Sequence, residues 1–366
     1  MKLRLVLTVA ALTCASLPTH AQPGALTISD VRVTPLKTGT RAAVTFRTSA
    51  PALGYAVASA NDALASASAS IGARERQAPG TDHLIVLEPL ESGTSYEVTV
   101  GARGLDGATA EEVRTTVTAV HGPGAFDAAS STYTLNVLMR FDWDLSSEEM
   151  NAWRAHAHEF ATRVNDMTDG WIRLGTVILA DADARDAVWA PQCRPACPAG
   201  ADVAIYTGYG YSTYLQTGHR VTLMWQQAML GGIRSSTSSI EFPRYLICCF
   251  GGTPSAPLDM GTQWWTGKRL AHEFGHYAMW LQDQYEPPVC DSSHHDLSIM
   301  GADLYRTEID SADTPCAWQG GGARNSWDQT LIAYYDEIPS RIGPPDPGPH
   351  TPGDAFSVVV VDRGVA

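Results

Sequence analysis

The chain has 366 residues, a formal net charge of −14 and a pI near 5.1. An acidic chain lacks the basic surface that attracts a phosphate backbone, so nucleic acid is excluded as a partner. The length is sufficient for two ordinary domains, each with a hydrophobic core of its own.

Residues 1–21 have the pattern of a secretory signal peptide. Lys2 and Arg4 precede an apolar run from Leu5 to Ala15, and the segment ends at Ala21, a small residue suited to cleavage. The run is shorter than the roughly 20 residues that cross a bilayer, and no other stretch is long and apolar enough. We therefore expect an exported, soluble product, secreted or periplasmic, without a transmembrane segment.

Of the seven cysteines, Cys14 lies in the signal segment, which leaves an even number for the exported chain. An even number in an exported protein favours disulfide bonds. The six are Cys193, Cys197, Cys248, Cys249, Cys290 and Cys316. The alternative is that Cys193 and Cys197 form half of a zinc site, but no second pair at suitable spacing completes it. As a hypothesis, Cys290 pairs with Cys316, because the two bracket the loop that follows the motif helix described below.

Residues 22–120 are predicted to be all-β. The runs 44–48 and 96–100 alternate apolar and polar side chains, with turn residues between the runs and no convincing helical pattern. The segment Leu90-x2-Gly93-Thr94-x-Tyr96-x-Val98-x-Val100 resembles a fibronectin type III domain. In that family the tyrosine, here Tyr96, closes a corner of an immunoglobulin-like sandwich. The family usually has a tryptophan in its first core strand, and we expect Phe46 to fill that place.

Residues 121–132 are expected to be a linker, and residues 133–340 an α/β domain. The segments 133–141 and 171–180 are apolar strands, and Ser146-x2-Glu149 is a capping box that predicts a helix between them. His156 and His158 of this helix are expected to be solvated and to have no role. Residues 341–366 are a proline-rich tail, with a candidate strand at 356–361.

The motif His272-Glu273-x-x-His276 lies in an amphipathic helical stretch. Residues four apart share a helix face, so the two imidazoles can bind one metal ion. Zinc is the expected ion, because imidazole ligands suit it and the catalytic form keeps one position open for water. Glu273 lies about 100° round the helix axis, where it is placed to hold that water rather than the metal.

Two histidines hold zinc weakly, so a third protein ligand is expected downstream. Gln282 occupies the position of the third histidine of metzincins, and Asp283 follows it. A continuous helix would carry Asp283 about 10 Å along the axis from His276, beyond reach of the metal. The chain must therefore leave the helix near 279–281 and turn back.

The run His272-Glu273-x2-His276-x6-Asp283-x-Tyr285 resembles the metalloprotease domain of the calcium-activated chloride channel regulators and bacterial secreted peptidases of the IgA-peptidase kind. The resemblance implies a metzincin-like zincin fold with His272, His276 and Asp283 as zinc ligands. It also implies that Ser298-Ile299-Met300 is the Met-turn, with Met300 beneath the metal. Those families usually have a glycine where this chain has Met279 or Trp280, and a glycine eases the turn out of the helix.

Several alternatives stay open in the same region. If the turn does not form, the rival third ligands are His294, His295 and Asp296. Tyr285 or Tyr305 is a candidate oxyanion or substrate contact, although a packing role is the more frequent one for tyrosine. Carboxylates near the motif also suggest calcium, but no loop of recognised spacing is present. Five tryptophans around the motif are expected to be buried, or else to line a substrate groove: Trp264, Trp265, Trp280, Trp318 and Trp327.

The sequence thus predicts a multidomain chain in which an all-β, fibronectin type III-like sandwich precedes an α/β, metzincin-like zincin domain. We expect a secreted zinc endopeptidase acting on protein or peptide, with Glu273 as general base and acid. One alternative is a non-catalytic binding or adhesion protein on the same scaffold. Another is a metal-dependent amidase or deacetylase acting on cell-wall or glycan substrates.

Overall fold

The structure is a computed structural model, and parts of the chain are described in it. These are residues 25–36, 40–61, 70–74, 79–119, 125–181, 202–211, 240–246, 258–281, 299–300, 309, 316–317, 323–324, 327, 331, 335, 337–341 and 356–362. They form an N-terminal antiparallel β unit and a C-terminal unit with a largely parallel sheet and two α-helices.

The N-terminal unit consists of β1 (Ile28–Leu36), β2 (Arg41–Ala60), β3 (Ile71–Arg74), β4 (Gly80–Leu87), β5 (Ser95–Gly104) and β6 (Val113–Thr118). The first half of β2 pairs with β1 and β4, whereas its second half pairs with β3 and β5. Strand β6 pairs with β5. Val44 and Leu87 of the first layer share one buried core with Val98 and Val100 of the second. Two layers thus face each other across a common core, and residues 25–119 contain no helix in the described positions.

Two residues singled out in the sequence, Tyr96 and Phe46, make contacts that hold this unit together. The hydroxyl of Tyr96 accepts a hydrogen bond from the backbone N–H of Glu91 at 2.8 Å, which ties the start of β5 to the preceding turn. Phe46 is buried in the core, and its ring stacks on that of His83 with a centroid separation of 4.4 Å.

The second sheet has the strand order β12-β11-β10-β8-β9-β15, and β7 also pairs with β8. Its strands are β7 (Ala125–Asp127), β8 (Thr132–Phe141), β9 (Ile172–Ala180), β10 (Val203–Tyr211), β11 (Ile240–Leu246), β12 (Leu258–Asp259) and β15 (Ser357–Val361). All neighbours are parallel except β7 with β8 and β12 with β11. The prediction of a linker over 121–132 was wrong in part, because β7 forms inside it and pairs with the strand that follows.

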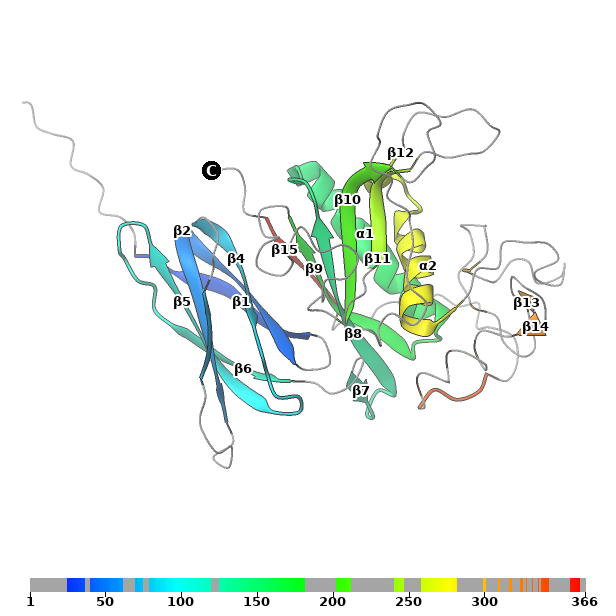
Figure 1. The fold of residues 1–366 in the computed structure, drawn as a ribbon, viewed down its shortest axis with the longest axis horizontal. Coiled ribbons are helices and arrows are strands. Elements are labelled where there is room, and N and C mark those ends of the chain that lie inside the picture. Colours follow the sequence, from blue (N-terminus) through cyan, green and yellow to red (C-terminus); the bar gives the residue numbers. More distant parts are fainter. Residues whose placement is uncertain are drawn as a thin grey trace, which may run out of the picture.

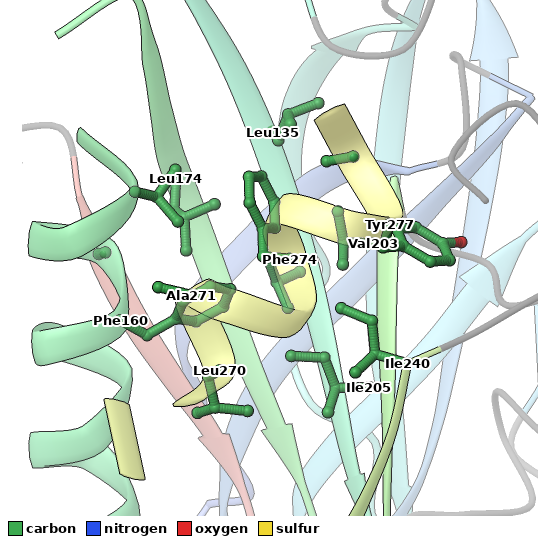
Figure 2. Packing of buried hydrophobic residues seen from close by; sticks show 14 of the residues in the cluster. Leu135, Phe160, Leu174, Val203, Ile205, Ile240, Leu270, Ala271, Phe274 and Tyr277 are labelled. Atoms are coloured by element: carbon green, nitrogen blue, oxygen red, sulfur yellow. The ribbon is translucent and has the colours of Figure 1, made fainter. Parts of the chain in front are cut away.

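Helix α1 (Ser147–Met167) begins at the predicted capping box, in which Ser146 and Glu149 each bond the other's backbone N–H. Helix α2 (Thr266–Met279) follows the 3₁₀ turn η4 (Met260–Thr262). Both helices share one core with the sheet residues Leu135, Val137, Met139 and Phe141, which alternate along β8 and point to one face. Figure 2 shows Phe274 and Ala271 of α2 within this core, with Phe160 of α1 beside them.

The N-terminal unit covers the opposite face of the same sheet, as Figure 1 shows. The side chains that meet there are Leu36, Ala43 and Leu84 from the N-terminal unit and Leu138, Ile178, Ala180 and Val361 from the sheet. All seven are at most 1% exposed, and the Asn136 side chain donates a hydrogen bond to the Pro35 carbonyl at 3.0 Å. The central sheet therefore lies between α-helices on one face and β-strands on the other.

The candidate strand near the C-terminus forms as β15 and adds to the sheet edge in parallel with β9. The short strands β13 (Cys316–Ala317) and β14 (Ala323–Arg324) pair with each other. No helix in the described part of the chain is long and apolar enough to cross a membrane.

Candidate metal centre

Helix α2 carries the whole His272-Glu273-x-x-His276 motif. Its apolar residues Leu270, Phe274 and Tyr277 are at most 2% exposed and pack on the sheet (Figure 2). The motif residues are also withdrawn from solvent, with His272 and Glu273 4% exposed and His276 8% exposed. Buried polar side chains need partners, so the contacts of the two imidazoles decide what they can do.

Both imidazoles use Nδ1 to contact a backbone carbonyl. His272 Nδ1 lies 2.9 Å from the Ile299 oxygen, and His276 Nδ1 lies 2.6 Å from the Leu281 oxygen. A carbonyl oxygen can only accept, so Nδ1 carries the proton in both rings, and in the neutral form Nε2 carries the lone pair. The ring centroids are 4.8 Å apart at an interplanar angle of 88°. This tautomer is the one that metal-binding histidines adopt when a carbonyl orients them.

The chain leaves α2 within the predicted range of residues 279–281. The helix ends at Met279, and Trp280 takes the left-handed conformation with φ 58° and ψ 28°. The N–H groups of Trp280 and Leu281 both bond the Gly275 carbonyl, which brings Leu281 back to His276. A left-handed residue with a side chain costs about 1–2 kcal/mol relative to glycine. The absent glycine therefore does not prevent the turn, and Trp280 makes it instead.

Met300 lies against the middle of α2. It is fully buried, and a Cβ added to Gly275 would come within 2.8 Å of its sulfur. The preceding residue, Ile299, provides the carbonyl that orients His272. Ile299 thus orients the His272 imidazole, and its neighbour Met300 packs its sulfur against Gly275 of the same helix.

Tyr335 holds the end of α2 and was not recognised from the sequence. Its hydroxyl donates to the Ala278 carbonyl at 2.9 Å, one of the last carbonyls of the helix, which have no partner within it. Its ring meets Tyr133 of β8 edge-on at 4.8 Å. The tyrosine is 57 residues from its partner, and no local pattern marks such a contact.

Helix α1 fixes the start of α2. A Cβ on Gly267 would come within 2.5 Å of the Glu159 side chain and 2.9 Å of the His156 carbonyl oxygen. Phe160 meets Phe274 edge-on at 5.6 Å. The expectation that His156 is solvated was wrong: its Nε2 lies 2.8 Å from the Gly261 carbonyl oxygen, and burial lowers its pKa. His156 therefore joins α1 to the turn that leads into α2, whereas His158 is exposed as expected.

Several predicted site residues lie outside the described residues. They are the third-ligand candidates Asp283, His294, His295 and Asp296, together with Tyr285 and Tyr305. Cys316 lies in β13, but Cys290, its predicted partner, is outside the described part, as are the other four cysteines of the exported chain. Within the described ranges no group of three or more His, Cys, Asp or Glu side chains is placed to hold a metal.

The tryptophans around the motif divide into two kinds. Trp265 and Trp327 are buried, as expected. Trp264 and Trp280 are 57% and 43% exposed, so the expectation of burial was wrong for these two, which flank α2 at its start and its end. Trp318 is outside the described residues.

Comparisons with known proteins identify no family. No family model matches the chain, and no curated protein does. Among solved structures, a myokine structure matches at 20% identity and a TM-score of 0.21, over 26% of this chain and 97% of that one. The fn3 domain of human collagen alpha-1(XX) matches at 20% identity and a TM-score of 0.23, over 29% and 96%. A purple acid phosphatase from yellow lupin matches at 14% identity and a TM-score of 0.22, over 43% and 29%.

Proposed function

We propose that this chain is an exported zinc-dependent endopeptidase. The observation that carries the proposal is the pair of imidazoles on one turn of α2, each with Nδ1 directed at a backbone carbonyl. That arrangement fixes both tautomers so that Nε2 of each ring would be the atom that binds a metal. His156 shows that one buried imidazole on a carbonyl can be purely structural, whereas two of them four residues apart, with Glu273 beside them, form the donor pattern of a metal-binding helix.

The donor set suits zinc. His272 and His276 supply two neutral nitrogen ligands, and Asp283, four residues beyond the end of α2, would supply the third on the basis of the sequence resemblance. The reversal at Trp280 supports this assignment, because it ends the helix before it could carry Asp283 away. When bound, zinc would lower the pKa of a coordinated water and polarise the substrate carbonyl. Met300 would form the apolar floor beneath the ligands.

Glu273 would handle the proton. Its carboxylate would accept a proton from the attacking water and then pass it to the nitrogen that leaves when the peptide bond breaks. The side chain is 4% exposed, so little bulk water competes for that proton. A protein that only binds has no chemical use for a carboxylate at this position, which favours the enzyme over an adhesion protein.

We infer in addition that the N-terminal unit is a fibronectin type III-like sandwich and the C-terminal unit a metzincin-like domain. The hydrogen bond between Tyr96 and Glu91 and the two-layer strand pairing support the first. A largely parallel sheet with an antiparallel edge strand, followed by the motif helix, supports the second. The signal segment supports export.

The test is hydrolysis of an unfolded protein by the mature chain, compared with Glu273→Ala. We expect the parent to cut and the variant to be inactive, whereas equal rates in both would end the catalytic proposal. A parallel panel of cell-wall glycans separates a peptidase from an amidase or deacetylase, since only the latter would act on the glycans and spare the protein.

A further inference from the structure

A cavity of about 180 Å³ lies between the N-terminal unit and the C-terminal sheet. The N-terminal unit provides side chains of β1, β2 and β4, and the other wall comes from Arg154 of α1 and residues 358–360 of β15. The cavity lies at the β15 edge of the sheet, and no residue of α2 lines it, so it is separate from the candidate metal centre.

Three arginines line this cavity in an otherwise acidic chain, which has 39 Asp and Glu residues against 25 Lys and Arg. Arg32, Arg47 and Arg154 line it, together with Asp30 and Asp82. Arg47 is paired with Asp82 at 2.7 Å. Arg32 and Arg154 have no ion-pair partner among the described residues. Three arginines against two aspartates leave one excess positive charge in the lining, and Asp30, Asp82 and Asp362 all act on Arg47, whose pKa they raise.

The cavity wall also contains a buried hydroxyl. Thr45 is 5% exposed, and it lines the cavity. Phe46 and His83 stack beside it, and both are at most 2% exposed. Burial lowers the pKa of His83 to about 4, so the ring adds no positive charge at neutral pH. A threonine hydroxyl can donate a hydrogen bond to an anion bound beside it.

We propose that this cavity binds a small oxyanion, held by the guanidinium groups of Arg32 and Arg154 and by the Thr45 hydroxyl. Guanidinium groups present paired N–H donors that match phosphate, sulfate and carboxylate oxygens. The volume corresponds to roughly six waters at about 30 Å³ each, enough for one such group with some of its hydration. Since Arg32 belongs to β1 and Arg154 to α1, the bound anion joins the two units.

The test is the thermal unfolding of the mature full-length chain at constant ionic strength, with inorganic phosphate replacing chloride. A second series uses glucuronate, which carries its carboxylate on a sugar. The variant combines Arg32→Gln with Arg154→Gln, both on exposed side chains. Arg103→Gln is the matched control, because Arg103 is an exposed arginine of the same N-terminal unit that does not line the cavity.

We expect a saturable rise in Tm of about 3 °C once the anion exceeds its Kd by about tenfold, in the parent and in Arg103→Gln. The double variant should show only the unsaturable increase that such salts give to any protein. Thr45→Val should weaken the apparent affinity by about tenfold, without changing charge. A response to phosphate alone identifies a free ion as the ligand, and a response to glucuronate alone a sugar-borne carboxylate. A saturable rise retained in the double variant, or absent from the parent with both anions, overturns the proposal, which does not depend on peptidase activity.

Discussion

Gly267→Ala should destabilise the protein, although the same change at an ordinary helix position is favourable. Gly267 is the second residue of α2, where it crosses α1. An added Cβ would come within 2.5 Å of both Cβ and Cγ of Glu159 and 2.9 Å of the His156 carbonyl oxygen. The Glu159 Cβ and the backbone oxygen cannot rotate away, so the helices must separate.

The sign of the effect follows from two opposing terms. Replacing glycine by alanine in a helix gains about 1 kcal/mol of propensity. Overpacking a close contact costs about 1–3 kcal/mol, and a contact with main-chain and Cβ atoms belongs at the upper end, about 3 kcal/mol. The expected net loss in the free energy of unfolding is therefore about 2 kcal/mol.

Equilibrium unfolding in urea, followed by circular dichroism, measures this difference. Gly72→Ala is the matched control, because a Cβ there meets only a Val57 methyl at 3.9 Å. The control should unfold within about 0.5 kcal/mol of the parent. If Gly267→Ala proves as stable as the parent or more stable, the close crossing of α1 and α2 is refuted.

Three further predictions concern other contacts. Leu84→Ala, in the apolar contact between the two units, should lower the free energy of unfolding by about 2–5 kcal/mol. The control Leu105→Ala, at a leucine that is 76% exposed, should lower it by less than about 0.5 kcal/mol. Similar losses for both variants in thermal unfolding would contradict the packing of Leu84 between the units. Because burial lowers the pKa of His83 to about 4, the unfolded chain takes up this proton first as the pH falls. The contribution of His83 to the free energy of unfolding is therefore complete above about pH 6.5 and falls by up to about 3 kcal/mol towards pH 4. His83→Gln should flatten the dependence of stability on pH between these values. An unchanged slope would count against a buried neutral ring. Tyr335→Phe removes the donor to the Ala278 carbonyl at the end of α2 and should lower stability by about 1–3 kcal/mol, measured by urea unfolding; a variant as stable as the parent would show that the bond is not needed.

Local patterns predicted much of the C-terminal unit. The capping box of Ser146 and Glu149 marked the start of α1, because both partners lie within one helix turn. The apolar spacing of Leu270, Phe274 and Tyr277 marked the buried face of α2. The apolar run near the C-terminus was recognised as a strand candidate, but its place beside β9 depends on a partner far away in the sequence.

Contacts between distant segments account for what the sequence did not predict. Trp280 adopts a left-handed backbone conformation that is unfavourable for a residue with a side chain. It occurs together with two hydrogen bonds of the next residue, from the Leu281 N–H to the Gly275 carbonyl and from His276 Nδ1 to the Leu281 carbonyl. No local feature of the sequence separated the buried His156 from the exposed His158, because the partner of His156 is the Gly261 carbonyl across the fold. The packing of the N-terminal unit on the sheet likewise depends on residues such as Leu36 and Ile178, which have no local signal of their own.

The central claim is that α2 binds a catalytic zinc ion and that Glu273 moves the proton. The most direct measurement is zinc content and peptide hydrolysis on the same preparations of the mature chain, Glu273→Gln and His276→Ala. We predict zinc in the parent and in Glu273→Gln but not in His276→Ala, with hydrolysis lowered by about 10²–10⁴-fold in Glu273→Gln. A parent without zinc after equilibration with the metal, or a Glu273→Gln variant as active as the parent, would contradict the account.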